Sequence, residues 1–230
     1  MQAVILAGGL GTRLRPITER IPKPMVEVGG EPFLARLVRW LGQQGFRRQL
    51  LLLGYRGEIV SDYFGDGSRV GVAIDYGREP SPLGTAGALR NALDKLEDDF
   101  LLLYGDSYLP IDYRPIASDF RKAACRGLLV VYDNRVADTG VTNNVALDSE
   151  GWVKRYAKGQ SAARLQYVEA GVLCFRRDVF EALPAGKLVS LEQDLYPKLI
   201  AERQLRAFVT PQRFFDIGTP QRLEEFAATL

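Results

Sequence analysis

Three glycines and two arginines stand close together near the start of the sequence, in the stretch LAGGLGTRLRP. Gly8, Gly9 and Gly11 permit backbone conformations that other residues avoid, and they let the main chain approach a ligand closely. Successive N–H groups in such a turn form a concavity that binds anions. Arg13, and Lys23 farther along in IPKPM, add positive charge that suits a polyphosphate. The pattern favours a phosphate-binding loop, and a glycine-rich surface turn with solvated arginines is the alternative.

Two familiar phosphate-binding motifs do not fit this stretch. A dinucleotide fingerprint requires a third glycine at the position that Leu14 occupies. A Walker loop requires a glycine-lysine pair at the end of a fixed spacing, and the sequence has no such segment. The loop is therefore a phosphate loop of a different type.

The sequence contains no histidine and only two cysteines, Cys125 and Cys174. The lack of histidine excludes Ser-His-Asp and Cys-His nucleophiles and most transition-metal sites. Two cysteines this far apart form neither a disulfide framework nor a zinc site, and a buried reduced pair is expected. Any chemistry must use carboxylates, lysines, arginines or the backbone.

Strand-like and helix-like segments alternate in the first half of the chain. Apolar runs predict strands at residues 3–6, 49–53, 70–76 and 100–104. Apolar spacing predicts a helix from Pro32 to Gly42 or Gly45, and further helices at residues 58–64 and 86–96. This alternation is typical of a doubly wound sheet, which binds ligands beyond the carboxyl ends of its strands. The glycine loop and Asp106, which follows Gly105, would both lie at that edge.

The pattern changes to shorter strands after about residue 127. Strands are predicted at residues 128–132, 144–147, 153–156 and 167–175, and helices at 191–202 and 220–228. We expect antiparallel or mixed strands that wall the second half of the cleft. The expected fold class is α/β: a single Rossmann-like doubly wound mixed sheet with a small antiparallel portion in the second half. The sequence contains no internal repeat or linker, so one domain is expected over residues 1–230.

Composition limits the classes of partner. The chain of 230 residues is 47% hydrophobic and carries a net charge of +2, so no strong overall field attracts nucleic acid or an anionic membrane. The longest apolar runs have the length of strands, and the N-terminus has no basic segment before a signal-peptide core. We expect a cytoplasmic protein with neither a nucleic acid nor a membrane as partner.

The motifs together match those of a known family. The stretch LAGGLGTRLRPITERIPKPMVEVGGEPFL resembles the signature of the sugar-1-phosphate nucleotidylyltransferases, the NTP-transferase family. The resemblance continues, in the expected order, through EPSPLGTAGAL, LLLYGDSYL, YVEAGVLCF and FFDIGTPQRL. The most similar branch is that of the bacterial heptose-1-phosphate and mannose-1-phosphate guanylyltransferases.

The resemblance implies that a sugar-1-phosphate oxygen attacks the α-phosphorus of a nucleoside triphosphate, which gives a nucleotide sugar and pyrophosphate. The attacking phosphate monoester has a second pKa of about 6, so it is already charged at neutral pH and needs no general base. Positioning and charge neutralisation must then supply the catalysis. The implied catalytic residues are Arg13, Lys23 and Asp106. Asp106 and Asp216 are the implied ligands of Mg²⁺, and a helix N-cap or turn role is the alternative for either aspartate alone.

The resemblance also implies where the nucleotide binds. The implied nucleotide-binding residues are Leu6, Ala7, Gly8, Gly9, Gly11, Thr12, Glu79, Pro82, Gly84 and Thr85. An ionised carboxylate at Glu79 can only accept hydrogen bonds, and guanine offers it two adjacent donors, N1–H and N2–H₂. Uracil and thymine offer one donor between two carbonyl oxygens, so GTP is favoured. Alternatively, Glu79 pairs with Arg78 or Arg90 and the backbone reads the base.

Sugar-phosphate binding is implied for three residues. Family members carry Glu-Lys-Pro where this sequence reads AKG, so Lys158 keeps the lysine but its neighbours depart from the pattern. Glu169 and Gly171 match positions that contact the sugar, and an edge-strand charge and a β-bulge are the alternatives. Glu192 and Asp194 either line the same cleft or begin a helix.

The leading hypothesis is a Mg²⁺-dependent enzyme that uses GTP and D-glycero-α-D-manno-heptose 1-phosphate or mannose 1-phosphate for surface-glycan biosynthesis. A uridylyl-, thymidylyl- or cytidylyltransferase, on another sugar phosphate or on phosphocholine, is the alternative within the fold. A non-catalytic nucleotide-binding regulator is the alternative of another class. The residues leave assembly into a homo-oligomer open.

Overall fold

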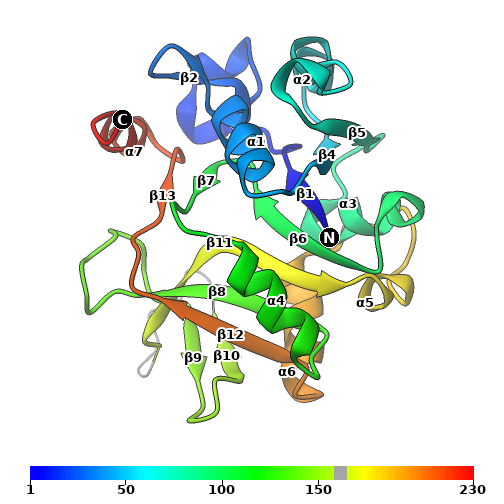
Figure 1. Cartoon of the computed structure of the whole chain (residues 1–230), viewed down its shortest axis with the longest axis vertical. Helices are drawn as coiled ribbons and strands as arrows, with labels where there is room; N and C mark the ends of the chain where they lie inside the picture. The colour runs from blue at the N-terminus through cyan, green and yellow to red at the C-terminus, as the bar shows by residue number, and fades with distance from the viewer. Residues whose placement is uncertain (158–164) are drawn as a thin grey trace.

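The computed structural model describes residues 1–157 and 165–230 as a mixed nine-stranded sheet with helices on both faces and two small two-stranded sheets (Figure 1). The strands are β1 (Gln2–Leu6), β2 (Glu27–Val28), β3 (Glu31–Pro32), β4 (Arg48–Leu53), β5 (Ala73–Arg78), β6 (Asp99–Tyr104), β7 (Ser107–Tyr108), β8 (Gly127–Asp133), β9 (Val145–Leu147), β10 (Val153–Tyr156), β11 (Tyr167–Arg176), β12 (Leu205–Thr210) and β13 (Phe215–Asp216). The helices are α1 (Phe33–Gln43), α2 (Gly57–Phe64), α3 (Gly84–Asn91), α4 (Arg114–Lys122), α5 (Asp178–Glu181), α6 (Tyr196–Ala201) and α7 (Pro220–Ala227).

The parallel half of the sheet has the strand order β5-β4-β1-β6. β1, β4 and β6 are mostly apolar because successive side chains point to opposite faces and helices cover both faces, whereas the edge strand β5 has exposed residues. In β1, Ala3 and Ile5 pack with α1 and α4 on one face, whereas Val4 packs with α3 and α6 on the other. Figure 1 shows α1 and α4 in front of the sheet and α6 behind it. The predicted doubly wound α/β sheet is confirmed.

The chain reverses its direction of winding between β1 and β6. From β1 it proceeds through β4 to the edge strand β5, and α3 then carries it back across the sheet to β6, on the other side of β1. Such a reversal opens a crevice beyond the carboxyl ends of the two strands. Ala7 follows β1 and Gly105 follows β6, and the Gly105 N–H donates to the Leu6 carbonyl at 2.9 Å. The two loops of chemical interest therefore begin side by side.

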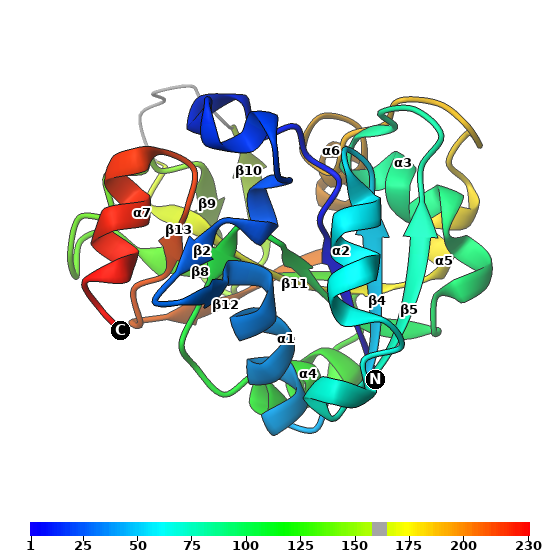
Figure 2. The ribbon, with the colours of Figure 1, turned by 90° about the horizontal axis from the view of Figure 1, so that it is seen from above.

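The second half of the chain extends the same sheet with antiparallel strands, as expected. β11 runs antiparallel to both β6 and β8, and β12 lies parallel to β8 at the edge. β9 and β10 form an antiparallel pair that joins the start of β11. Seen from above, α7 and β13 lie on one side of the molecule and α3 and α5 on the other (Figure 2). No helix in the described part of the chain is long and apolar enough to cross a membrane.

Several predicted boundaries were wrong, and several elements were missed. The strand predicted at 70–76 begins only at Ala73, because Gly67 and Gly71 adopt positive φ around a 3-10 turn. The helix predicted at 86–96 is α3, which ends at Asn91 before a separate 3-10 turn. The helix predicted at 191–202 begins as a π-helical turn, Leu191–Leu195, before α6. The missed elements are α4, α5, β12 and the short strands β2, β3, β7 and β13.

Candidate active site

A cavity of about 570 Å³ lies beyond the carboxyl ends of β1 and β6. The glycine loop and the segment between β5 and α3 both line it. The predicted site residues that line it are Leu6, Ala7, Gly8, Gly9, Lys23, Glu79, Pro82, Gly84, Thr85 and Asp106. Those that do not line it are Gly11, Thr12, Arg13, Glu169, Gly171 and Asp216. Lys158 lies outside the described residues.

Gly8 brings the backbone of the loop against the opposite wall of this cavity. A Cβ atom at Gly8 would lie 2.8 Å from Glu79 Oε1 and 3.1 Å from the Gly54 nitrogen. Real Cβ atoms do not approach neighbours so closely, so only glycine fits without a shift of Glu79 or of the Gly54 backbone. A Cβ atom at Gly9, in contrast, would meet nothing within 4 Å. The close approach that the sequence predicted is thus required at Gly8 and not at Gly9.

Lys23 is buried at the floor of the site. Its residue is 7% exposed, and its Nζ donates to Asp106 Oδ2 at 2.5 Å. Pro22 precedes Lys23 and Pro24 follows it in a 3-10 turn, which limits the backbone around the ammonium group. Lys23 is therefore not a solvated surface charge. Arg13 is exposed, and its guanidinium packs beside Gly218.

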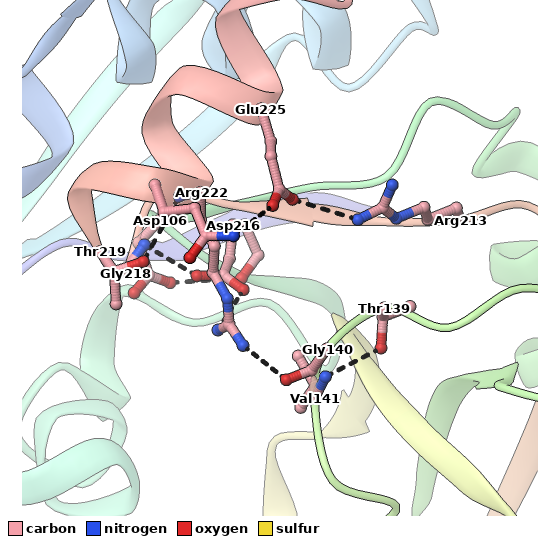
Figure 3. A network of polar contacts seen from close by, with 12 residues as sticks. Asp106, Thr139, Gly140, Val141, Arg213, Asp216, Gly218, Thr219, Arg222 and Glu225 are labelled. Carbon is pink, nitrogen blue, oxygen red and sulfur yellow. Dashed lines mark hydrogen bonds and ion pairs between the residues drawn. The ribbon is translucent and has the colours of Figure 1, made fainter.

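Asp216 is brought close to Asp106 by the small sheet of β7 and β13. In this antiparallel pair Asp216 lies opposite Ser107, the residue that follows Asp106. The Ile217 N–H also donates to the Asp106 carbonyl at 3.0 Å. Two acidic residues from segments far apart in the sequence are thus brought close together by their backbones (Figure 3).

Each of the two carboxylates already has a cationic partner. Lys23 pairs with Asp106, while Arg222 Nη1 donates to Asp216 Oδ2 at 2.9 Å and the Gly218 N–H donates to Oδ1 at 2.8 Å. Within the described residues no group of three or more acidic, histidine or cysteine side chains could enclose a metal ion. Mg²⁺ typically uses one or two carboxylates together with waters and substrate phosphates. The donor set of Asp106 and Asp216 fits that mode of binding.

Glu79 faces the cavity and pairs with neither arginine that was considered. Its Oε2 accepts from the Leu83 N–H at 3.0 Å. Arg78 donates to Ser61 Oγ, and Arg90 donates to the Leu183 carbonyl. Burial raises the pKa of the Glu79 carboxyl, and the hydrogen bond from Leu83 partly offsets this. The carboxylate is therefore a fixed, half-buried acceptor in the wall of the cavity.

Thr85 links this wall to the second half of the sheet. Its Oγ1 accepts from the Leu191 N–H at 2.8 Å and donates to Glu192 Oε2 at 3.2 Å. Asp194 instead accepts from the Ser190 N–H at 2.7 Å, which is the helix-start role considered for it. Glu192 lies one contact away from the cavity through Thr85, but it does not line the cavity.

Glu169 is buried rather than exposed on an edge strand. It is 8% exposed, and its carboxylate accepts from the hydroxyl groups of Tyr156 at 2.6 Å and Tyr196 at 3.3 Å. Burial, followed by the neighbouring Glu169 charge, raises the pKa of the Tyr156 hydroxyl, which keeps that group a proton donor.

Gly171 lies in a β-bulge of β11, where the register against β8 shifts between Glu169 and Leu173. Its φ is +76°, and a Cβ atom there would lie 2.7 Å from the Ser107 Cβ atom. The bulge considered as an alternative for Gly171 is thus present. The bulge lets β11 lie against Ser107, the residue that follows Asp106.

Comparison with known proteins identifies the family. The model of the family described as nucleotidyl transferase matches residues 2–230. The chain belongs to this family. It is 31% identical to D-glycero-alpha-D-manno-heptose 1-phosphate guanylyltransferase from Campylobacter jejuni, over 98% of this chain and 98% of that protein. It is 32% identical to mannose-1-phosphate guanylyltransferase from Mycobacterium tuberculosis over the whole chain, and it spans 64% of that longer protein.

A solved structure agrees with the sequence relatives. HddC from Yersinia pseudotuberculosis, crystallised with GMP-PN, superposes with a TM-score of 0.81 and 31% identity over 99% of this chain and 98% of that one. The resemblance on which the sequence prediction depended is therefore confirmed, including the guanylyltransferase branch.

Two residues at or beside the site of this chain were not predicted from the sequence. Tyr55 lines the cavity, and its hydroxyl donates to the Glu19 carbonyl beyond the glycine loop at 3.2 Å. Arg222 pairs with Asp216, although the segment FFDIGTPQRL was singled out without a role for this arginine. A signal existed for Arg222: a helix that begins near Pro220 places a side chain of its first turn beside the strand residue that precedes it.

Proposed function

We propose that the protein is a Mg²⁺-dependent guanylyltransferase that forms a nucleotide sugar and pyrophosphate. Its substrates would be GTP and D-glycero-α-D-manno-heptose 1-phosphate or mannose 1-phosphate, used in surface-glycan biosynthesis. The observation that carries the choice of nucleotide is the Glu79 carboxylate, held against Gly8 in the wall of the cavity. The named activities of the two sequence relatives and the guanine nucleotide bound by HddC support the same choice.

Glu79 reads the base through its capacity as an acceptor. One oxygen accepts from the Leu83 N–H, and each carboxylate oxygen has two lone pairs. The N1–H and N2–H₂ groups of guanine would supply donors to this acceptor, whereas the carbonyl oxygens of uracil or thymine would repel it. Pro82, Gly84 and Thr85 form the adjoining wall, where the base would lie.

The reaction itself requires positioning rather than proton transfer. An oxygen of the sugar phosphate attacks the α-phosphorus of GTP, the bond to the β-phosphate oxygen breaks, and pyrophosphate leaves with the electron pair. Lys23, buried and fixed between two prolines, supplies a positive charge at the floor of the cavity. The backbone of residues 6–12 would approach the triphosphate, and Arg13 would add a positive charge from the exposed side.

Asp106 and Asp216 would hold the Mg²⁺ ion. When bound, the ion would neutralise phosphate charge and bring the reacting groups into line. The side chains must then share their partners: Lys23 remains close to Asp106 and Arg222 remains close to Asp216. Each carboxylate thus has a cationic neighbour both before and after the metal ion binds.

The acceptor sugar would lie on the β11 side of the cleft. Tyr156 and Tyr196 orient the Glu169 carboxylate, which would accept a hydrogen bond from a sugar hydroxyl. Gly171 has no side chain, so the backbone of β11 can lie against Ser107. Lys158 would pair with the sugar phosphate. A cytoplasmic location is part of the proposal, and the buried, unpaired thiols of Cys125 and Cys174 are in keeping with a reducing compartment.

The test is to incubate the protein with GTP, Mg²⁺ and each of the two sugar phosphates, with glucose 1-phosphate and phosphocholine for comparison. Pyrophosphate is followed by a coupled assay, and the nucleotide product is identified by mass spectrometry. We expect GDP-heptose or GDP-mannose as the main product. Nucleotide binding without any pyrophosphate release from this panel or from other nucleoside triphosphates would favour the non-catalytic regulator instead.

A further inference from the structure

Arg222 forms hydrogen bonds to two segments that lie far apart in the sequence. Its Nη1 donates to Asp216 Oδ2 at 2.9 Å, and its Nη2 donates to the Gly140 carbonyl at 3.0 Å (Figure 3). The planar guanidinium can make two such bonds at once because its donors form a rigid fork. The carboxylate proposed to hold metal is thus tied to the loop at residues 134–144.

The base of Arg222 is fixed by the packing of α7. Phe226, one turn farther along the helix, is 1% exposed and contacts the rings of Phe33, Tyr108 and Phe215 at centroid distances of 5.3, 5.4 and 5.7 Å. Thr219 caps the helix, accepting from the Arg222 N–H at 3.4 Å. The arginine therefore extends from an anchored helix.

The loop on the other side of Arg222 is organised around one asparagine. Asn134 Oδ1 accepts from Thr139 Oγ1 at 2.8 Å, and its Nδ2 donates to the Val141 carbonyl and to Asn143 Oδ1, each at 2.9 Å. A shift of Gly140 is therefore transmitted to the whole loop.

The end of this loop contacts the half of the cleft assigned to the sugar. Asn144 Oδ1 accepts from the Glu169 N–H at 2.9 Å. Asn143 Nδ2 donates to the Leu165 carbonyl at 3.2 Å. The hydrogen-bonded path from Asp216 through Arg222 thus reaches the backbone of Glu169.

We propose that Arg222 is a positioning residue that couples the two halves of the cleft. On one side it moderates the affinity of Asp216 for the divalent cation, and on the other it holds the 134–144 loop in place for the sugar phosphate. The proposal rests on the proposed function, since it takes the metal and the acceptor from there.

The two roles predict effects of opposite sign. Replacing Arg222 by methionine removes a positive charge beside the metal ligand, while the Gly218 N–H still orients Asp216. We therefore expect the dissociation constant for the cation to fall about fivefold, because a like charge within a few ångströms opposes cation binding. The KM for the sugar phosphate should rise about tenfold, because the loop loses a hydrogen bond to a charged donor. A merely structural lesion would weaken both.

The experiment measures Mn²⁺ binding to the free protein by electron paramagnetic resonance, with no nucleotide or sugar present. Hydrogen exchange of residues 134–143 in the free protein reports on the loop, and the KM values for sugar phosphate and GTP are measured separately. For Arg222→Met we expect tighter Mn²⁺ binding, faster exchange in the loop, a raised KM for the sugar phosphate and a nearly unchanged KM for GTP.

Three further variants separate the two roles. Arg222→Lys keeps a positive charge beside Asp216 but cannot also bridge to Gly140. This variant should therefore raise the KM for the sugar phosphate and leave the Mn²⁺ affinity near that of the wild type. Thr139→Val loosens the loop from its other side and should do the same. Arg213→Met breaks an ion pair with Glu225 in which Asp216 takes no part, and it should change neither quantity.

The outcomes are distinguishable. If the wild type neither binds Mn²⁺ nor turns over any sugar phosphate, the proposed function is wrong. If the wild type does both, and Arg222→Met shows weaker or unchanged Mn²⁺ affinity or an unchanged KM for the sugar phosphate, the coupling role of Arg222 is wrong.

Discussion

Lys23 and Asp106 are 83 positions apart in the sequence, and their side chains meet at 2.5 Å on the floor of the cleft. The lysine comes from the segment after the glycine loop, and the aspartate comes from the end of β6. Their contact joins the two loops that open at the reversal between β1 and β6. A cation and a carboxylate, each with a role in the proposed chemistry, are thereby held together before any phosphate arrives.

Replacement of either partner should abolish turnover while the protein stays folded. Lys23→Met removes the buried charge expected to act on the phosphates, and Asp106→Asn removes a metal ligand. We expect kcat to fall by a factor of about 10² to 10³, the range seen when one preorganised electrostatic group is lost. Steady-state pyrophosphate release gives the rate, and circular dichroism checks the fold.

The matched control for this pair is Lys95→Met. Lys95 forms an ion pair of 2.9 Å with Asp75, but on an exposed surface. Exposed pairs contribute little to stability, so this variant should retain both activity and fold. Near-normal kcat in Asp106→Asn would mean that the metal assignment is wrong.

Gly8→Ala should weaken GTP binding because the new methyl group would push Glu79 away from the cavity wall. Overpacking of this kind costs about 1–3 kcal/mol, which corresponds to a rise of about tenfold or more in the KM for GTP. Gly9→Ala is the control, since a Cβ atom there meets nothing within 4 Å. Equal effects of the two substitutions would contradict the close approach at Gly8.

Glu79 should distinguish GTP from its analogue inosine triphosphate, which lacks the 2-amino group. If the carboxylate accepts from N2–H₂ as well as N1–H, the wild type should prefer GTP by about tenfold in kcat/KM, the value of one hydrogen bond to a charged group. Glu79→Gln should lose most of this preference, because an amide presents one acceptor oxygen beside a donor. An equal preference in both proteins would show that the backbone reads the base.

The same residue gives a prediction about stability and pH. Burial raises the pKa of Glu79 in the folded state, so its contribution to stability is fully present below the ordinary carboxyl pKa and is lost as the pH rises through the raised value. Glu79→Gln cannot ionise and keeps an oxygen for the Leu83 N–H. Its melting temperature should therefore exceed that of the wild type at pH 7, with the gap closing near pH 4. A gap that widens at acid pH would contradict the direction of the shift.

Most of the fold could be predicted because buried parallel strands have an unmistakable apolar pattern. β1, β4 and β6 were found within one or two residues, since most positions in them are buried. β12 was missed because it lies at the sheet edge, where Arg206 interrupts the apolar pattern. The end of α3 was misplaced because the 3-10 turn at Leu93–Lys95 continues its apolar spacing.

Site residues that belong to a sequence motif could be predicted, whereas contacts between segments far apart in the sequence could not. Gly8 and Gly9 of the glycine loop, Lys23 and Glu79 were identified from motifs and do line the cavity. The bridge from Asp216 through Arg222 to Gly140 was not, because Arg222 and Gly140 are 82 positions apart and the partner at Gly140 is a backbone carbonyl. A backbone acceptor has no sequence signature, so only the three-dimensional arrangement reveals it.

The measurement that tests the account most directly is kcat/KM for pyrophosphate release with GTP, UTP, dTTP, CTP and ATP. Each nucleotide is offered with Mg²⁺ and saturating heptose or mannose 1-phosphate. The account predicts a clear preference for GTP that depends on Glu79. A preference for a pyrimidine nucleotide would contradict the reading of guanine by Glu79, and no turnover with any pair would contradict the assignment as a sugar-1-phosphate guanylyltransferase.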